Sequence, residues 1–164
     1  MFIIDHASKI SFAFPLTRRD SNSILAHLKI WVNETLPSYG IILRNFYSDG
    51  WAELVSNDVL SILRSSGATT SHLPRDTPET NSITERWVRS LKEKVMCMLL
   101  RSSLPVAFWW MAVCTACHLL HRFPTKTANG YMTPHECVFG VAPYLKWLRI
   151  RGCKCYVLKP IAEK

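Results

Sequence analysis

Two acidic residues in the chain have neighbours and a spacing suited to metal-assisted chemistry on phosphates. Asp49 follows an apolar run and precedes a glycine, and Glu85 comes after a further 35 residues, in the stretch PETNSITERWVRSLKEK. Arg89 and Lys92 follow Glu85 at offsets of four and seven, which puts all three on one face of a helix. Divalent cations such as Mg²⁺ prefer carboxylate oxygens, and phosphates prefer Lys and Arg. The pattern therefore indicates a surface that offers ligands for both.

Each acid also has a simpler structural interpretation. Asp before Gly is common in turns, and an acid in the first turns of a helix complements the positive end of the helix dipole. Asp49, however, ends a predicted central strand, at the edge where open α/β sheets bind ligands. The basic residues that follow Glu85 then favour the functional interpretation.

The charge of the chain favours an anionic partner. Its 164 residues include 20 Lys and Arg against 12 Asp and Glu, a formal net charge of +8. Residues 1–80 hold 7 basic and 8 acidic side chains, whereas residues 81–164 hold 13 and 4. The second half carries the whole excess, which suits phosphate binding but which solubilising surface lysines would also produce.

The hydrophobic pattern predicts one α/β domain with helices on a mixed sheet. Strands are predicted on either side of a turn at 7–9, at 41–48 with both faces covered, and at 68–73. Helices are predicted from an N-cap at Asp20 or Ser21 to Pro37 and Gly40, from a cap at Ser56 to Gly67, over 81–102, and over 105–120. One face of the third helix carries Ile83, Trp87, Leu91, Val95 and Met98. Such alternation of strands and helices is typical of α/β layers.

The sequence predicts an intracellular protein that does not cross a membrane. No basic leader follows Met1, and the apolar run 104–120 is shorter than the ~20 residues of a bilayer span and contains Thr115 and His118. The six cysteines are expected to be mostly free thiols in a reducing compartment.

Five ordered motifs resemble those of copia-type (Ty1/copia) retrotransposon integrases, which carry the D,D(35)E signature. SDGWAEL is similar to the family's S-D-N-G-x-E-F, and TPETNSITER to its T-P-Q-Q-N-G-x-x-E-R. FIIDHASK is similar to F-I-D-D-Y-S-R, and LPVAFWWMAVCTACHLLHRFPT to L-P-x-x-F-W-x-E-A-x-x-T-A-x-Y-L-x-N-R-x-P. MTPHECVFGVAPYLKWLRIRGCKCYVL is similar to T-P-x-E-x-x-x-G-x-x-P-x-x-x-x-L-R-x-F-G-C-x-x-Y. The resemblance covers most of the chain.

The resemblance implies a ribonuclease-H-like fold, a mixed sheet flanked by helices, and a part in DNA integration. Residues 1–122 would form the catalytic core and 123–164 an extension toward the rest of a Pol polyprotein. The family's polynucleotidyl transfer uses Mg²⁺ or Mn²⁺ on three carboxylates. By carry-over, Asp49 and Glu85 are catalytic and bind metal. DNA partners, self-association, a nuclear location and no small-molecule substrate are implied as well.

Two basic groups are predicted to bind DNA. Arg89 and Lys92 match basic helix positions of retroviral relatives that hold the DNA end. A late cluster could follow the DNA backbone or form a solvated face, and we expect the former. This cluster contains Lys146, Arg149, Arg151, Lys154 and Lys159, and the predicted DNA-binding residues are Arg86, Arg89, Lys92, Arg149, Arg151 and Lys154.

The chain departs from the family pattern at several points. The family's first acid should fall upstream of Met1, and Asp5 matches a later hairpin strand instead. Gly50-Trp51 replaces Asn-Gly, and Ser82 replaces a glycine ahead of Glu85, which should stiffen that loop. We therefore expect the isolated chain to be inactive. The alternative is a non-catalytic DNA-binding or assembly module derived from an integrase.

Three further groups are predicted to be structural. Cys114, Cys117, His118 and His121 share one helix face and could ligate zinc, but one helix rarely supplies three tetrahedral ligands, so a core role is favoured. Trp87, Trp109 and Trp110 could stack on bases but are predicted to be core residues. Cys153 and Cys155 are predicted to pack in a strand.

Overall fold

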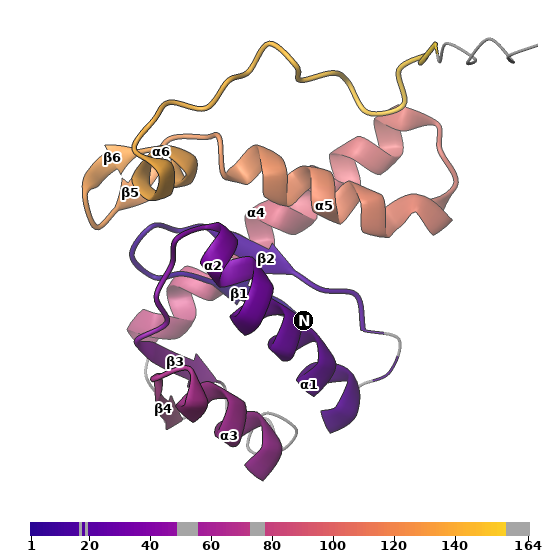
Figure 1. Ribbon diagram of the computed structural model, residues 1–164. Coiled ribbons are helices and arrows are strands. Elements are labelled where there is room, and N and C mark those ends of the chain that lie inside the picture. Colours follow the sequence, from indigo (N-terminus) through magenta and orange to yellow (C-terminus); the bar gives the residue numbers. More distant parts are fainter. Residues whose placement is uncertain (17, 19, 49–55, 73–77, 157–164) are drawn as a thin grey trace, which may run out of the picture.

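A computed structural model describes residues 1–16, 18, 20–48, 56–72 and 78–156, with side chains omitted for 72 and 78–81 (Figure 1). Asp49, Gly50, Trp51 and Lys159 lie outside the described residues. The fold is α/β, with small sheets flanked by helices. Its described strands pair as three two-stranded sheets, β1–β2, β3–β4 and β5–β6.

The predicted hairpin at the N-terminus is present. β1 (Phe2–Ile4) pairs antiparallel with β2 (Ser11–Ala13), and Phe2 lies opposite Ala13. The Asp5 carboxylate shapes the turn by accepting hydrogen bonds from the backbone N–H of Ser8 at 2.7 Å and from its hydroxyl at 2.6 Å. Asp5 is thus a turn residue.

The first helix spans the predicted range but contains a π-helical turn. α1 (Ser21–Ile30) begins at the predicted cap, where the Asp20 side chain accepts from Ser23 N–H at 2.7 Å. A π-helical turn, η1 (Trp31–Thr35), then leads into α2 (Leu36–Ser38). The helix ends at Ser38, between Pro37 and Gly40, as predicted. Pro37 lies just after the π turn, which already interrupts the regular bonding, so its missing N–H is tolerated there. The chain turns at Gly40 with φ of 66°.

The hairpin, α1, η1, α2 and α3 (Asn57–Ser65) enclose the first core. Phe12 meets Trp31 edge-on at 6.0 Å between ring centroids and Tyr39 at 5.3 Å. The buried members of this core are Ile10, Phe12, Ile24, Leu28, Trp31, Val32, Leu36, Val59 and Leu63.

The predicted strand at 41–48 is shorter and more exposed than expected. β3 (Asn45–Ser48) pairs in parallel with β4 (Thr69–His72). Ile42, ahead of β3, is 79% exposed and Tyr47 is 51% exposed, so the prediction that both faces of this strand are covered is wrong. Ser56 stands at the N-cap of α3, but its hydroxyl makes no capping bond. Gly67 ends α3 as predicted, with φ of 80°.

Two long helices enclose the second core. α4 (Pro78–Ser102) is followed by the 3₁₀ turn η3 (Val106–Phe108) and by α5 (Trp109–Leu120). Leu91 of α4 packs with Ala116, Cys117 and Leu120 of α5, and Phe2 of β1 adjoins this group. Trp87, Val95 and Met98 also pack here, as predicted for this face. Trp109, by contrast, is 49% exposed, so its predicted core position is wrong.

The remaining residues form a small unit attached to the core and an irregular tail. β5 (Thr125–Thr127) and β6 (Gly130–Met132) form a hairpin, and α6 (Pro134–Phe139) follows. Backbone bonds from Ala128 N to Ala7 O and from His135 N to His121 O, both 2.9 Å, tie this unit to the core. Residues 141–156 contain no strand, so the predicted packing of Cys153 and Cys155 in a strand is wrong, and both are exposed. None of the described helices could cross a membrane.

Candidate functional site

The segments that lead to the two predicted acids, Asp49 and Glu85, both begin at the carboxyl end of the parallel pair β3–β4. Ser48, the buried last residue of β3, lies opposite His72, the last residue of β4. Because the strands are parallel, the chain leaves Ser48 toward Asp49 and leaves His72 toward α4 at the same end of the pair. Asp49 itself lies outside the described residues. Joint metal binding by Asp49 and Glu85 therefore stays a prediction.

Glu85 lies in the first third of α4, on the side of the helix away from the second core. Its side chain is exposed and forms no hydrogen bond or ion pair with any described residue. Arg89 and Lys92 are exposed too, whereas Leu91 on the opposite face is buried. The helix thus presents the predicted carboxylate and both predicted cations on one open face. A free carboxylate of this kind has the oxygen chemistry that Mg²⁺ or Mn²⁺ requires.

The hairpin turn contributes a basic residue that the sequence patterns did not single out. Burial lowers the pKa of Lys9, and the nearby positive charge of Arg86 lowers it further, while Asp5 acts in the opposite direction. Lys9 is therefore an electrostatic neighbour of α4. It lies far from Arg86 in the sequence and in a turn with φ of 65°, so no motif or spacing marks it. Arg86 itself is exposed, and its Nε donates to the carbonyl of Ser82 at 3.1 Å.

The predicted DNA-binding residues near the C-terminus differ in their exposure and in their hydrogen bonds to the protein. Arg151 is half-buried, and its guanidinium donates to Thr115 Oγ1 at 3.2 Å and to the carbonyl of Phe108 at 3.0 Å. Arg149 is exposed but folds back to donate to the carbonyls of Lys146 and Leu148, at 2.7 and 2.9 Å. Lys154 is exposed. Arg151 thus ties the chain around residue 151 to η3 and α5, and its predicted binding of DNA stays a prediction.

The Cys and His residues of α5 divide between core and surface. Cys117 is buried, and burial raises the pKa of its thiol to about 11, which makes it unreactive. His121 is also buried, and burial lowers the pKa of its imidazole to about 4. Cys114 and His118 are exposed, contrary to their predicted core role. Among the described residues, no group of three or more His, Cys, Asp or Glu could hold a metal ion.

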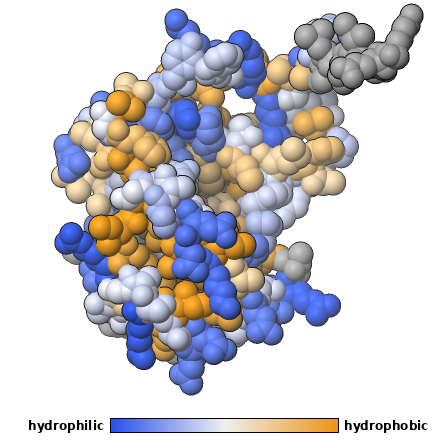
Figure 2. All heavy atoms as spheres, viewed as in Figure 1, coloured by the Kyte–Doolittle hydropathy of each residue, from blue (hydrophilic) through white to orange (hydrophobic). Residues whose placement is uncertain are grey.

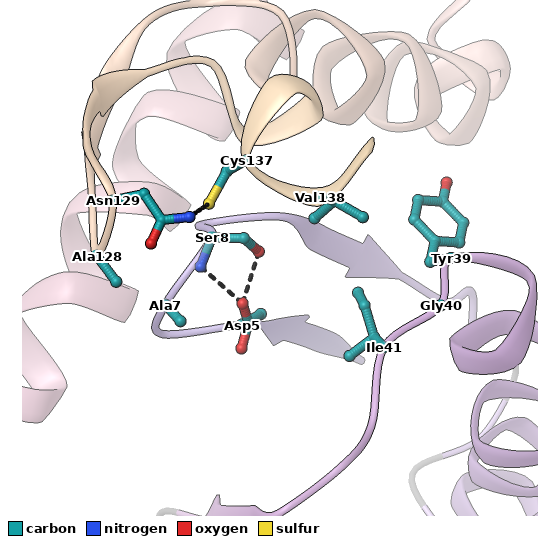
Figure 3. A pocket seen from close by; sticks show the side chains of 10 residues that line it. All are labelled: Asp5, Ala7, Ser8, Tyr39, Gly40, Ile41, Ala128, Asn129, Cys137 and Val138. Carbon is teal, nitrogen blue, oxygen red and sulfur yellow. Dashed lines mark hydrogen bonds between the residues drawn. The ribbon is translucent and has the colours of Figure 1, made fainter. Parts of the chain in front are cut away.

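A cavity of about 270 Å³ lies between the first hairpin turn and the β5–β6 unit (Figure 3). Its lining includes Asp5, Ser8, Tyr39, Asn129 and Cys137. The carboxylate of Asp5 is used by Ser8, and Asn129 Nδ2 lies 3.6 Å from Cys137 Sγ. Asp5 thus pairs with Ser8, and Asn129 with Cys137, and no described residue of α4 is among those that line the cavity.

Comparison with known proteins places the chain among retroelement proteins, although no family model matches it. It is 27% identical over 164 residues to the retrovirus-related Pol polyprotein from transposon RE1 of Arabidopsis thaliana, covering 95% of this chain and 10% of that protein. It is 30% identical over 122 residues to the Pol polyprotein from transposon TNT 1-94 of Nicotiana tabacum, covering 74% and 9%. An uncharacterized mitochondrial protein of Arabidopsis thaliana is 37% identical over 82 residues, covering 46% and 68%.

Solved structures give the fold. The catalytic core domain of BIV integrase superposes with a TM-score of 0.64 at 14% identity, over 84% of this chain and 82% of that one. A chain of the simian T-cell lymphotropic virus intasome superposes with a TM-score of 0.65 at 15% identity, over 96% and 52%. The chain is thus homologous to copia-type Pol polyproteins and has the fold of retroviral integrase catalytic cores.

The integrase-core fold confirms the predicted ribonuclease-H-like class. The chain spans about a tenth of the length of the Pol polyproteins that it matches. The proposed boundary between an integrase core at 1–122 and an extension at 123–164 stays a prediction.

Proposed function

We propose that the chain acts as the catalytic-core segment of a copia-type integrase, in the joining of element DNA to target DNA by metal-dependent polynucleotidyl transfer. The observation that carries the proposal is the open face of α4, where Glu85, Arg89 and Lys92 are exposed together while the opposite face is buried. Packing of the helix does not require an unpaired carboxylate and two cations on its exposed face.

Each residue of this face has a distinct proposed role. Glu85, together with Asp49, would hold Mg²⁺ or Mn²⁺. The bound metal would supply the Lewis acidity that activates the attacking oxygen and stabilises the leaving oxygen. Arg89 and Lys92, with Arg86 and Lys9 beside them, would hold the phosphates of the DNA end and fix the position of the scissile bond.

The isolated chain is proposed to be inactive. The family's first acid matches no residue of this sequence, and the carboxylate of Asp5 is occupied by Ser8. With one carboxylate of three lacking, the positions of the metal ions would not be fixed. DNA ends, target DNA and other copies of the chain are the proposed partners, because one structural neighbour is an intasome. The nucleus is the proposed place of action.

The test joins the chain to a preceding strand that carries an acid and measures Mg²⁺-dependent nicking and strand transfer on DNA. We expect Glu85→Gln to abolish the activity. Glu93→Gln, which changes another exposed acid of α4, should leave it intact. Activity that survives Glu85→Gln would contradict the proposed role of this carboxylate.

A non-catalytic DNA-binding module is the second candidate, because the basic residues of α4 require no carboxylate to bind phosphates. Arg86, Arg89 and Lys92 are exposed whether or not a metal is bound nearby. Salt-sensitive DNA binding that is unchanged by Mg²⁺, in an extended chain that does not nick DNA, would support this candidate over the first.

A further inference from the structure

An irregular segment after α6 exposes an unusual amount of apolar surface. We call residues 141–156 the strap, and Figure 1 shows it running from α6 back toward the junction of α4 and α5. Within its first ten residues, five large apolar side chains are at least half exposed: Val141, Tyr144, Leu145, Trp147 and Ile150. Single exposed apolar residues are ordinary, but a group of them in ten residues is typical of a binding surface.

A tight turn in the strap holds two exposed aromatic rings close together. Leu148 N–H donates to the carbonyl of Leu145 at 3.0 Å, which places Lys146 and Trp147 at the tip. Trp147 is 79% exposed, and its ring lies 6.0 Å from that of Tyr144. Lys146 Nζ lies 5.9 Å from the centre of the Tyr144 ring. The rings and the cation therefore form one outward-facing group, which we call the aromatic turn.

The far end of the strap is fixed to the core, so the aromatic turn has a defined place. Arg151 bonds to Thr115 of α5 and to the carbonyl of Phe108. Gly152, with φ of 81°, passes so close to Ser102 that an added Cβ would lie 2.9 Å from the Ser102 carbonyl oxygen. Nearer the tip, the two bonds from Arg149 to Lys146 and Leu148 brace the turn itself.

The charge of the strap selects the kind of partner. Residues 141–156 contain four basic side chains and no acidic one. In Figure 2 the upper edge of the molecule mixes hydrophilic, pale and hydrophobic residues rather than forming a continuous apolar surface. Four like charges disfavour the strap of a second copy as the occupant, whereas they attract a phosphate backbone. Aromatic rings beside such charges are the combination that binds unpaired bases.

We propose that the aromatic turn binds an unpaired DNA tail, with bases stacked on Trp147 and Tyr144 and phosphates held by Lys146 and Arg149. The inference rests on the proposed function and adds a substrate class to it, namely DNA whose end is partly single-stranded. Arg151 and Gly152 act as positioning residues, because they fix the strap and do not project into the aromatic turn.

The experiment compares the affinity of the chain for a blunt duplex and for the same duplex with a short unpaired tail, at fixed salt. We expect the tailed duplex to bind more tightly, and Trp147→Ala to reduce its affinity by roughly fivefold to 150-fold, the range for loss of one stacked base. The affinity for the blunt duplex should change less than about twofold. Trp147→Phe retains a stacking ring and should keep most of the tail preference.

Tyr144→Ala should also weaken binding of the tailed duplex, because it removes the second stacking ring. Tyr131→Ala is its matched control and should not, because Tyr131 is 78% exposed on β6, outside the strap. Equal affinity for the two duplexes, or a tail preference that Trp147→Ala leaves intact, overturns the inference. Salt-sensitive binding of the blunt duplex would still uphold the proposed function in that case. If Trp147→Ala changes only the oligomeric state in sedimentation, the turn is a contact between copies and the inference is also overturned. Binding of neither duplex overturns both proposals.

Discussion

At the scale of single residues, the best-defined polar contact of the core joins the end of α5 to the first hairpin. The N–H of Ser11 donates to His121 Nε2 at 3.0 Å, and the imidazole is 9% exposed. A protonated Nε2 has no lone pair with which to accept this bond. Burial opposes protonation as well and lowers the pKa of His121 from 6.5 to about 4, although the Ser11 backbone partly offsets the shift.

This contact predicts a loss of stability in mild acid. In the unfolded chain His121 takes up a proton as the pH falls through about 6.5, whereas in the folded chain it stays neutral until about pH 4. Since the unfolded state binds more protons in this window, the free energy of unfolding should fall by roughly 2 kcal/mol from pH 7 to pH 5. Urea unfolding at several pH values measures it.

The control for this pH dependence is His6→Gln, which changes an exposed histidine in the hairpin turn. This variant should keep the slope between pH 5 and 7. His121→Gln should reduce the slope. A part of the slope should remain, because the pKa of His118 is also lowered. An unchanged slope in His121→Gln would show that burial of this imidazole does not control acid stability.

The sequence predicted the orientation of Glu85, Arg89 and Lys92 because helical periodicity fixes which residues share a face. It did not reveal Lys9, whose nearness to Arg86 depends on tertiary packing of a hairpin turn against α4. It also did not reveal that Arg151 is engaged, because the partners Phe108 and Thr115 lie 43 and 36 residues away. Local patterns thus identify which groups are present, whereas long-range contacts decide which of them are free.

At the scale of elements, α4 separates packing from chemistry by its two faces. Leu91 is buried against α5, whereas Met96 is 56% exposed near Lys92. We expect Leu91→Ala to lower the free energy of unfolding by about 2–5 kcal/mol and Met96→Ala to change it by less than about 0.5 kcal/mol. Chemical denaturation of the two variants measures the difference. Similar losses in both would contradict the assignment of the buried face.

The strap gives a second prediction at this scale. Gly152→Ala should destabilise the attachment of the strap, since the left-handed φ costs about 1–2 kcal/mol and the collision with Ser102 adds about 1–3 kcal/mol. Gly140→Ala is the matched control, because φ there is 70° but no atom lies within 4 Å of the added Cβ. Hydrogen exchange of strap amides should rise more in Gly152→Ala than in Gly140→Ala. Equal exchange would show that the close approach to Ser102 does not hold the strap.

Element prediction succeeded where local signals were strong and failed where partners decide the outcome. The Asp20 cap and the helical patterns of α4 and α5 are local, and the cap and both helices are observed, although several α5 residues that were predicted to be buried are exposed. The length of the 41–48 strand depends on which strands pair with it, and no propensity marks the π turn inside the first helix, although the end of that helix was predicted. The residues around Cys153 have strand-like composition, but they adopt no strand because none of the described residues pairs with them.

At the scale of the whole molecule, the excess positive charge gives the most general test of DNA binding. Residues 81–164 carry 13 basic and 4 acidic side chains, and Arg89 and Lys92 stand on the open face of α4. Each phosphate contact releases a condensed counterion, so the logarithm of affinity should fall linearly with the logarithm of salt concentration. The slope of this plot is proportional to the number of phosphates that the protein contacts and does not depend on the DNA sequence.

We expect Arg89→Gln and Lys92→Gln each to make this slope shallower by about 0.9 on blunt duplex DNA, and the double variant by about twice as much. Lys29→Gln removes an equally exposed cation from α1, on the other core, and should leave the slope within error. Fluorescence anisotropy over a range of salt concentrations gives both values. If Lys29→Gln changes the slope as much as Arg89→Gln does, DNA responds to the net charge of the molecule rather than to the face of α4. The proposed orientation of the DNA end beside Glu85 would then be wrong.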